Sequence, residues 1–278
     1  MELAFWERVV AEDHRVPSEH SLADLTSELT TMLGDTDPHR RDGIACEVLA
    51  TWVSEGVYDH LLEGLGDGMA TGLLVGIGQR GTDSIFRRSF SALVLGECIS
   101  RDNDQRLLHR ETLLRWGDRL AGWLVRERDL RGYVEQKGWA HAVAHGADAL
   151  AALAASEAIG RSELSVLLDV IADRVLTNTD QRLVHGEEDR LALAAMQILR
   201  RDLLGLDVAE PWVDRLVKGA LPDLDRDCDP YSVAGNAQLF LRALYLQLAL
   251  APRAPAIRSD LLLSLIERLR TLHRHVLT

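Results

Sequence analysis

Apolar residues recur at helical spacing along nearly the whole chain, and this periodicity constrains the fold more than any single motif. The alternating apolar and polar pattern of strands is almost absent. The sequence therefore predicts an all-α fold. Helices are expected over residues 2–13, 21–33, 38–55, 57–63, 84–100, 106–127, 139–158, 162–176, 187–203, 210–218, 234–250 and 257–275.

Alternate predicted helices are centred near residues 45, 91, 148, 195 and 242. Their separation, about 46 to 57 residues, is close to the two-helix period of HEAT and armadillo arrays. We therefore predict a HEAT/armadillo-like α-solenoid of stacked helical pairs. No Pro-rich, Ser-rich or low-complexity stretch divides the chain, so residues 1–278 are predicted to form a single helical-repeat domain.

Composition and charge exclude several classes of protein. A chain that is 47% hydrophobic and 27% charged is typical of soluble globular proteins. Its net charge of -12 argues against nucleic acid as a partner, because phosphate backbones are bound by basic surfaces. No apolar run approaches the roughly 18 residues of a membrane span.

The cysteines and the N-terminal residues indicate a compartment. Cys46, Cys98 and Cys228 are too scattered for a disulfide framework or a metal knuckle. The N-terminal "MELAFWERVV" lacks the layout of a signal peptide. We therefore expect a reducing, cytoplasmic location.

The stretch "GIGQRG", Gly76–Gly81, matches the dinucleotide fingerprint G-x-G-x-x-G. It lacks the strand–turn–helix unit that gives this fingerprint its meaning, so we expect no NAD binding. Residues 64–81 are instead predicted to connect two helices, with glycines allowing positive φ and close helix approach. No P-loop, GxSxG or HExxH motif appears, so no nucleotide is expected and the common hydrolase signatures are missing.

The acidic stretch "DLDRDCDPY" places Asp225, Asp227 and Asp229 at three ligand positions of a calcium loop. Pro230 and Asn236, however, occupy the positions that require glycine and glutamate. The sequence predicts a solvated acidic loop without specific calcium affinity.

The stretch "WAHAVAHGAD" carries His141, His145 and Asp148 on a predicted helix that is otherwise mostly alanine. Helical geometry places the three side chains within an arc of roughly 60°. Two histidines and a carboxylate are a ligand set for one divalent metal, Zn, Fe or Mn. A metal-free functional pocket and a purely structural polar network are the two alternatives, and all three stay open.

In a solenoid the N-terminal turns of neighbouring helices line one rim, so further residues are expected to converge on His141. They are Arg87, Arg88, His185, Glu187, Glu188, Tyr231 and Asn236. His185 and Glu188 are candidate catalytic bases. The alternative is that His185 lies in water at a helix N-terminus, where Glu187 and Glu188 complement the macrodipole.

Lys137 and Trp139 flank the entry to the predicted central helix. With Arg88, Tyr231 and Asn236 they are candidate ligand-binding residues. A cation beside an aromatic wall suits a small anionic or planar ligand. The alternative is that Lys137 and Trp139 are ordinary surface residues of a turn.

Three stretches carry a resemblance to a known family: "FRRSFSALVLGECISRD" (86–102), "RDLRGYVEQKGWAHAVAHGADAL" (128–150) and "LVHGEEDRLALAAM" (183–196). In these the chain resembles the bacterial domain of unknown function 2785 family. The resemblance implies a helical bacterial protein and supplies no activity.

Two functions are consistent with these patterns. The first is a metal-dependent hydrolase acting on a small polar substrate, in which the metal or a histidine activates water. The alternative is a non-catalytic helical-repeat module that binds a peptide or protein partner. One deep polar pocket would favour the hydrolase, whereas polar residues spread along a groove would favour the binding module.

Overall fold

The computed structural model describes residues 1–222 and 229–277. In chain order its elements are α1 (Leu3–Ala11), α2 (Leu22–Met32), α3 (Pro38–Arg40), the π-helix η1 (Arg41–Cys46), α4 (Glu47–Ser54), α5 (Leu62–Gly72), α6 (Ser84–Gln105), α7 (Arg110–Arg126), β1 (Tyr133–Val134), β2 (Gly138–Trp139), α8 (Ala142–Ala155), α9 (Arg161–Leu176), α10 (Glu187–Leu199), α11 (Leu206–Gly219), α12 (Tyr231–Leu250) and α13 (Arg258–Leu272). The prediction of an all-α fold is confirmed, and one short hairpin interrupts the helices.

The chain divides into two compact units, Met1–Ala152 and Leu153–Thr278, and each is described by itself. The prediction of a single domain over residues 1–278 stays a prediction. In the described parts of both units, no helix is long and apolar enough to cross a membrane.

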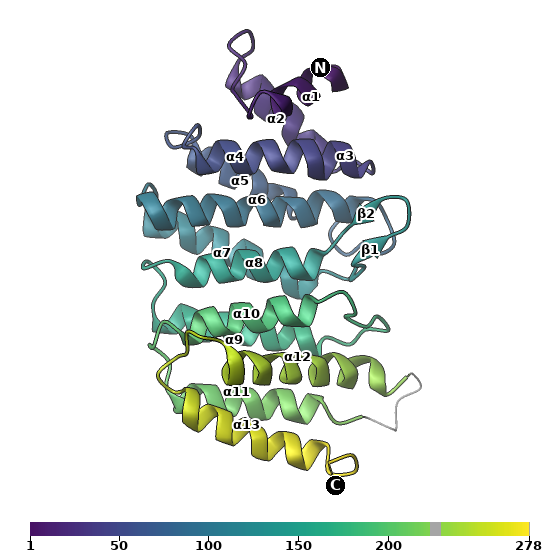
Figure 1. The fold of residues 1–278 in the computed structure, drawn as a ribbon, viewed down its shortest axis with the longest axis vertical. Coiled ribbons are helices and arrows are strands. Elements are labelled where there is room, and N and C mark those ends of the chain that lie inside the picture. Colours follow the sequence, from purple (N-terminus) through teal and green to yellow (C-terminus); the bar gives the residue numbers. More distant parts are fainter. Residues whose placement is uncertain (223–228, 278) are drawn as a thin grey trace. The chain divides into compact units, whose positions relative to one another are not determined.

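In the first unit, neighbouring helices pack against one another (Figure 1). α4 packs on α6, while α5 packs on both α6 and α7. The core is rich in tryptophan, because Trp6, Trp52, Trp116 and Trp123 are all essentially inaccessible to solvent. Rings of this size bury a large apolar area, which is the main stabilising term for packed helices.

The glycine-rich segment differs from its prediction. Residues 64–72 were expected to belong to a connection, but they continue the helix α5. A side chain at Gly66 would overlap the Trp116 ring, because its Cβ would lie 2.1 Å from Cζ2. Close packing of α5 against α7 thus outweighs the weak helix propensity of glycine. The predicted helix over 57–63 is wrong, since residues 57–61 form turns.

The predicted helix over 38–55 is present as a continuous run of α3, η1 and α4. The π-helix in its middle was not predicted. It begins at Arg41, whose side chain is fully buried, while Asp42 and Cys46 on the same turn are half-buried. Single π-turns of this kind occur often at functional sites.

In the second unit, α11 packs against α9 and α13, and α12 packs against α10. α12 also contacts α9, α11 and α13. Trp212 is buried in this unit. Its ring meets Phe240 edge-on at 5.9 Å between centroids, and its indole N–H donates to the carbonyl of Leu168 at 2.7 Å. The polar end of a buried Trp is thereby satisfied.

Candidate functional site

The helix that carries the candidate histidines begins later than predicted. The expectation was a helix from residue 139, but α8 starts at Ala142 and Trp139 lies in β2. His141 immediately precedes the helix with φ at 48°, and its carbonyl accepts the first helical hydrogen bond from the His145 N–H at 2.9 Å. The hairpin, which periodicity did not reveal, occupies the residues that would otherwise form another helical turn.

The two histidines nevertheless lie side by side. Their ring centroids are 6.0 Å apart, and the Trp139 ring lies 4.3 Å from that of His141. The centroid of the Tyr133 ring lies 5.0 Å from that of Trp139. We call Tyr133, Trp139, His141 and His145 the aromatic row.

Ser89, which the sequence analysis missed, orients His145. The Ser89 hydroxyl donates to the carbonyl of Ala140, and its oxygen lies 2.8 Å from His145 Nδ1. Because the hydroxyl has a single hydrogen, Nδ1 must be the donor in the second bond. A neutral His145 therefore carries its lone pair on Nε2. A buried serine in an apolar helix gives no signal in one sequence that would reveal this role.

The hairpin presents two exposed aromatic side chains. β1 and β2 pair antiparallel with Tyr133 opposite Trp139, and these side chains are 53% and 41% exposed. Gln136 and Gly138 adopt positive φ in the turn, at 63° and 76°. Large aromatic side chains are normally buried or engaged in binding, so an exposed pair in edge-to-face contact is informative.

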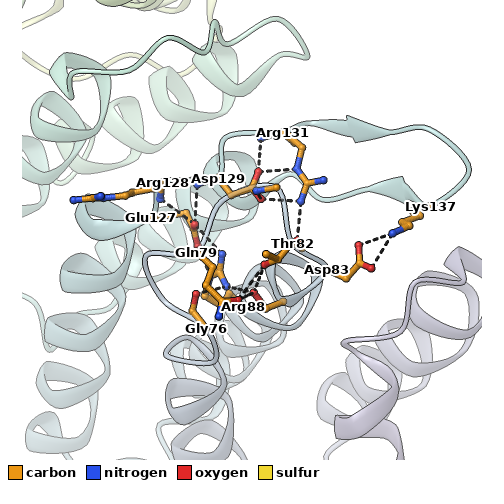
Figure 2. A network of polar contacts seen from close by, with 12 residues as sticks. Gly76, Gln79, Thr82, Asp83, Arg88, Glu127, Arg128, Asp129, Arg131 and Lys137 are labelled. Atoms are coloured by element: carbon orange, nitrogen blue, oxygen red, sulfur yellow. Dashed lines mark hydrogen bonds and ion pairs between the residues drawn. The ribbon is translucent and has the colours of Figure 1, made fainter.

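Two cations anchor this hairpin. Lys137 Nζ lies 2.7 and 2.8 Å from the two carboxylate oxygens of Asp83, as Figure 2 shows. The fully buried Arg41 donates to the carbonyls of Lys137 and Trp139, at 2.9 and 3.4 Å. Lys137, predicted to bind a ligand, is thus engaged within the protein.

Two aromatic rings contact the guanidinium of Arg41. Its guanidinium carbon lies 4.2 Å from the Phe86 centroid and 4.9 Å from that of Phe90. Phe90 also meets His145 edge-on at 5.0 Å. Phe90 of α6 therefore contacts both Arg41, which anchors the hairpin, and His145 of the aromatic row.

Arg88, a predicted ligand residue, is completely buried and faces Glu127 instead (Figure 2). Nε and Nη2 bond the two oxygens of that carboxylate, at 2.5 and 3.0 Å. Nη1 donates to the carbonyls of Val75 and Gly76 at 2.8 and 3.0 Å. The guanidinium thus ties the glycine loop to the end of α7. Every guanidinium nitrogen of Arg88 thus has a protein partner, and its role in ligand binding stays a prediction.

The "GIGQRG" stretch lies between α5 and α6, with helices rather than a strand on its two sides. Gly76, Gly78 and Gly81 adopt positive φ, at 63°, 84° and 73°. This is the conformation expected of glycines in a connection between two helices. The Gly81 N–H donates to Asp129 at 2.8 Å. The loop is held by its own polar network.

Three acidic side chains of the first unit are half-buried. They are Asp42 on η1, Glu97 on α6 and Asp148 on α8, and we call them the acidic strip. Burial raises the pKa of Glu97, and the negative charge of Asp148 raises it further. Burial also raises the pKa of Asp42, against the opposing effect of Arg41. These groups are spread over three separate helices.

No three His, Cys, Asp or Glu side chains among residues 1–222 and 229–277 come together as a metal ion requires. His145 and Asp148 lie on α8 and His141 lies just before it, and the three do not form a prepared three-ligand centre. The metal site stays a prediction.

The remaining candidate residues belong to the second unit. The His185 backbone N–H donates to the nearly inaccessible Glu187 at 2.8 Å. Burial raises the pKa of the neighbouring Glu188, while the proximity of His185 lowers it. Because these residues and His141 lie in different units, their convergence stays a prediction.

Tyr231 and Asn236, both on α12, have different environments. Tyr231 is 51% exposed at the start of the helix. Asn236 is buried, accepts from the Leu183 N–H at 2.9 Å, and donates to the carbonyl of Gln181 at 3.1 Å. Its amide therefore fixes the segment before α10. Asp225 and Asp227 of the candidate calcium loop lie outside the described residues.

The fold and the polar networks define an all-α protein with a rigid aromatic hairpin beside two histidines. The chain belongs to the family described as protein of unknown function (DUF2785), whose model matches residues 73–246. This confirms the resemblance, and all three stretches that carried it lie inside the match. No curated protein and no solved structure matches the chain significantly.

Proposed function

We propose that this protein is a helical-repeat module that binds a peptide segment of a partner protein on the aromatic row. The observation that carries the proposal is the exposed pair of Tyr133 and Trp139 on a hairpin anchored by Lys137 and Arg41. Tyrosine and tryptophan dominate the energetics of protein interfaces. A hairpin already held in place loses little conformational entropy when a partner binds.

The distribution of polar groups favours binding over hydrolysis. The acidic strip runs across η1, α6 and α8, and the aromatic row continues from the hairpin along α8. A hydrolase needs its acid, base and nucleophile within hydrogen-bond reach of one reacting group. Groups spread over several helices suit an extended ligand instead.

We also propose that the helices form HEAT-like pairs within each unit. Side-chain hydrogen bonds and ion pairs recur at sequence separations of 42 to 54 residues, close to the length of a two-helix repeat, which supports this proposal. The bonds and their separations are Arg101 to Asp59 (42 residues), Asn103 to Ala152 (49), Arg215 to Asp173 (42), Trp212 to Leu168 (44) and Arg268 to Asp214 (54).

Selection of random peptides on the intact protein tests the binding function. Peptides are selected on the wild type alone, and their affinities for the wild type and for a Trp139→Ala variant are then measured by fluorescence anisotropy. We expect Trp139→Ala to weaken binding at least about tenfold, the usual effect of losing a central aromatic contact. Leu107→Ala removes a similarly exposed apolar side chain in the same unit and should leave affinity unchanged. Equal binding by the wild type and Trp139→Ala would refute the proposal.

A hydrolase is the second candidate, favoured by one observation at Glu188. Its Oε2 is buried and forms no hydrogen bond with a described residue. A carboxylate with a raised pKa beside His185 is a candidate general base. Hydrolysis of a panel of chromogenic esters, phosphates and amides that disappears in Glu188→Gln would support this function.

The metal is tested separately, by elemental analysis of untagged protein. Near-stoichiometric Zn, Fe or Mn that is absent from the His141→Ala/His145→Ala double variant would support a metal-dependent hydrolase. Less than about 0.1 ion per chain, after reconstitution with each metal, would exclude it.

A further inference from the structure

We infer that a phosphate group binds to Arg87 and Ser91, which lie one helical turn apart on α6. The site lies where α6 packs against α5, and all of its residues belong to the first unit. The inference goes beyond the proposed peptide-binding function and does not depend on it.

Arg87 is the exception among the arginines of the first unit. Every other arginine of this unit that is buried or half-buried has a carboxylate partner. These residues are Arg40, Arg41, Arg88, Arg101, Arg115 and Arg131. Arg87 is also half-buried, yet its Nε is sealed from solvent and forms no hydrogen bond with a described residue.

The charge of Arg87 is therefore not compensated within the described protein. Burial lowers the pKa of Arg87, and no neighbouring negative charge of the described residues opposes this effect. A guanidinium that has lost water without gaining a counter-charge is costly for the folded chain. An anion supplied by a ligand would remove this cost.

The Ser91 hydroxyl is a second unsatisfied group at the same place. The Ser91 side chain is 0% exposed, and its hydroxyl forms no hydrogen bond with a described residue. A Cβ at Gly72 would overlap this hydroxyl and would lie 3.0 Å from Arg87 Nε. The two polar atoms thus border one backbone position of α5. Buried polar atoms normally have a hydrogen-bond partner, so this pair of donors lacks a shared acceptor.

The local structure holds the base of the Arg87 side chain and leaves its end unbound. A Cβ at Gly34, just after α2, would lie 3.2 Å from the Arg87 Cβ, so the two backbones approach closely there. No ion pair with a described residue restrains the guanidinium. It can therefore move outward and admit an oxygen atom between Nε and the Ser91 hydroxyl, which are both sealed in the free chain.

The donors favour phosphate over a carboxylate. The fork of an arginine binds two oxygens of either group. A planar carboxylate has only those two oxygens, and the fork uses both. A tetrahedral phosphate has a further oxygen that can accept from the Ser91 hydroxyl.

Titration of the full chain tests the site. The probes are inorganic phosphate, N-acetyl-O-phosphoserine amide and acetate, at constant ionic strength. Calorimetry measures the affinities, and NMR of the Arg87 Nε–H group locates the binding. We expect both phosphate compounds to bind saturably and to shift this resonance. Acetate should bind at least about tenfold more weakly, because it offers no oxygen to Ser91. The tighter phosphate compound shows whether the site takes a free ion or an ester.

Variants assign the binding to the two side chains. Arg87→Met retains the length of the side chain and should weaken phosphate binding at least about tenfold. Ser91→Ala keeps every charge and should weaken it about three- to tenfold, which tests the site even if Arg87→Met does not fold. Arg126→Met is the matched control. It removes an exposed guanidinium at the end of α7, with the same change in net charge, and should retain the wild-type affinity.

Three results would overturn the inference. The first is the absence of saturable phosphate binding to the wild type. The second is equal phosphate affinity of the wild type and Ser91→Ala. The third is acetate binding as tight as that of phosphate. None of these results bears on the peptide-binding function, which the Trp139→Ala variant tests separately.

Discussion

The Ser89 hydroxyl lies 2.8 Å from His145 Nδ1 while it donates its hydrogen to the carbonyl of Ala140. This relationship connects a fully buried residue of α6 to the half-buried face of α8. It fixes the tautomer of the neutral His145 ring, in which only Nε2 retains a lone pair.

Replacing Ser89 by alanine should therefore change the tautomer of His145. We expect Ser89→Ala to shift the imidazole ¹⁵N resonances toward the Nε2–H form at about pH 8, where a histidine of ordinary pKa is neutral. The lost hydrogen bonds should lower the free energy of unfolding by about 1–2 kcal/mol.

Ser91 is the matched control on the same helix. It is equally buried, and its hydroxyl forms no hydrogen bond with a described residue. Ser91→Ala should leave both the stability and the His145 resonances close to those of the wild type. Identical spectra for wild type and Ser89→Ala would contradict the assigned tautomer.

The glycines of α5 give a test of the helix that the sequence did not predict. Gly66→Ala should destabilise the protein, because the added Cβ would lie 2.1 Å from the Trp116 ring. A loss of about 1–3 kcal/mol is typical of overpacking in a core. Urea unfolding, monitored by circular dichroism, measures this loss.

Gly64 and Gly68 are internal controls, because a Cβ at either would meet no atom within 4 Å. Both lie in the same helix, so alanine should increase the free energy of unfolding by about 0.5–1 kcal/mol. If all three alanine variants behaved alike, the packing of α5 against Trp116 would be wrong.

These residues show where sequence reasoning succeeds. Apolar periodicity located α6, α9 and α13 to within a few residues, because each buries a continuous stripe against its neighbours. It failed at α5, where glycine propensity predicts a break but contact with a distant tryptophan selects a helix. It also missed the hairpin, whose strands are two residues long and stabilised from Arg41, almost a hundred residues earlier.

The candidate site was predictable in the same uneven way. The pairing of His141 with His145 follows from local spacing on and before α8. Ser89 and Glu97 were missed because their roles depend on which face of α6 meets α8, and no local pattern encodes that. The ion pair of Arg88 with Glu127 was also missed, because Glu127 is far along the chain and no local pattern links the two residues.

The ion pair between Arg88 and Glu127 should contribute strongly to stability. Both side chains are completely buried, and Glu127 also accepts from the Trp123 indole N–H at 3.1 Å. Arg88→Met would leave a buried carboxylate without its cation, and we expect a loss of about 3–5 kcal/mol in the free energy of unfolding. Chemical denaturation provides the measurement.

The exposed ion pair between Arg161 and Asp207 is the comparison. Its side chains are 53% and 69% exposed, so Arg161→Met should change stability by less than about 1 kcal/mol. Similar effects for the two arginine variants would show that Arg88 is not buried as described.

The pH dependence of stability should reveal the charge of Glu97. Burial and Asp148 raise its pKa in the folded protein, so the folded state binds this proton more tightly than the unfolded chain does. Stability therefore decreases as pH rises from the unfolded-state pKa to the folded-state pKa of Glu97, and this destabilisation is constant above the folded-state value. Glu97→Gln, which removes the buried charge, should raise the melting temperature at pH 7 and flatten this part of the profile.

Glu63 provides the opposite sign in the same unit. Hydrogen bonds from Arg115 and Thr112 lower its pKa, so its contribution is present at neutral pH and is lost as pH falls through the folded-state value. Glu63→Gln should therefore lower the melting temperature at pH 7, whereas Glu97→Gln raises it. A lower melting temperature for Glu97→Gln would mean that the folded protein stabilises this carboxylate, which would contradict the raised pKa of Glu97.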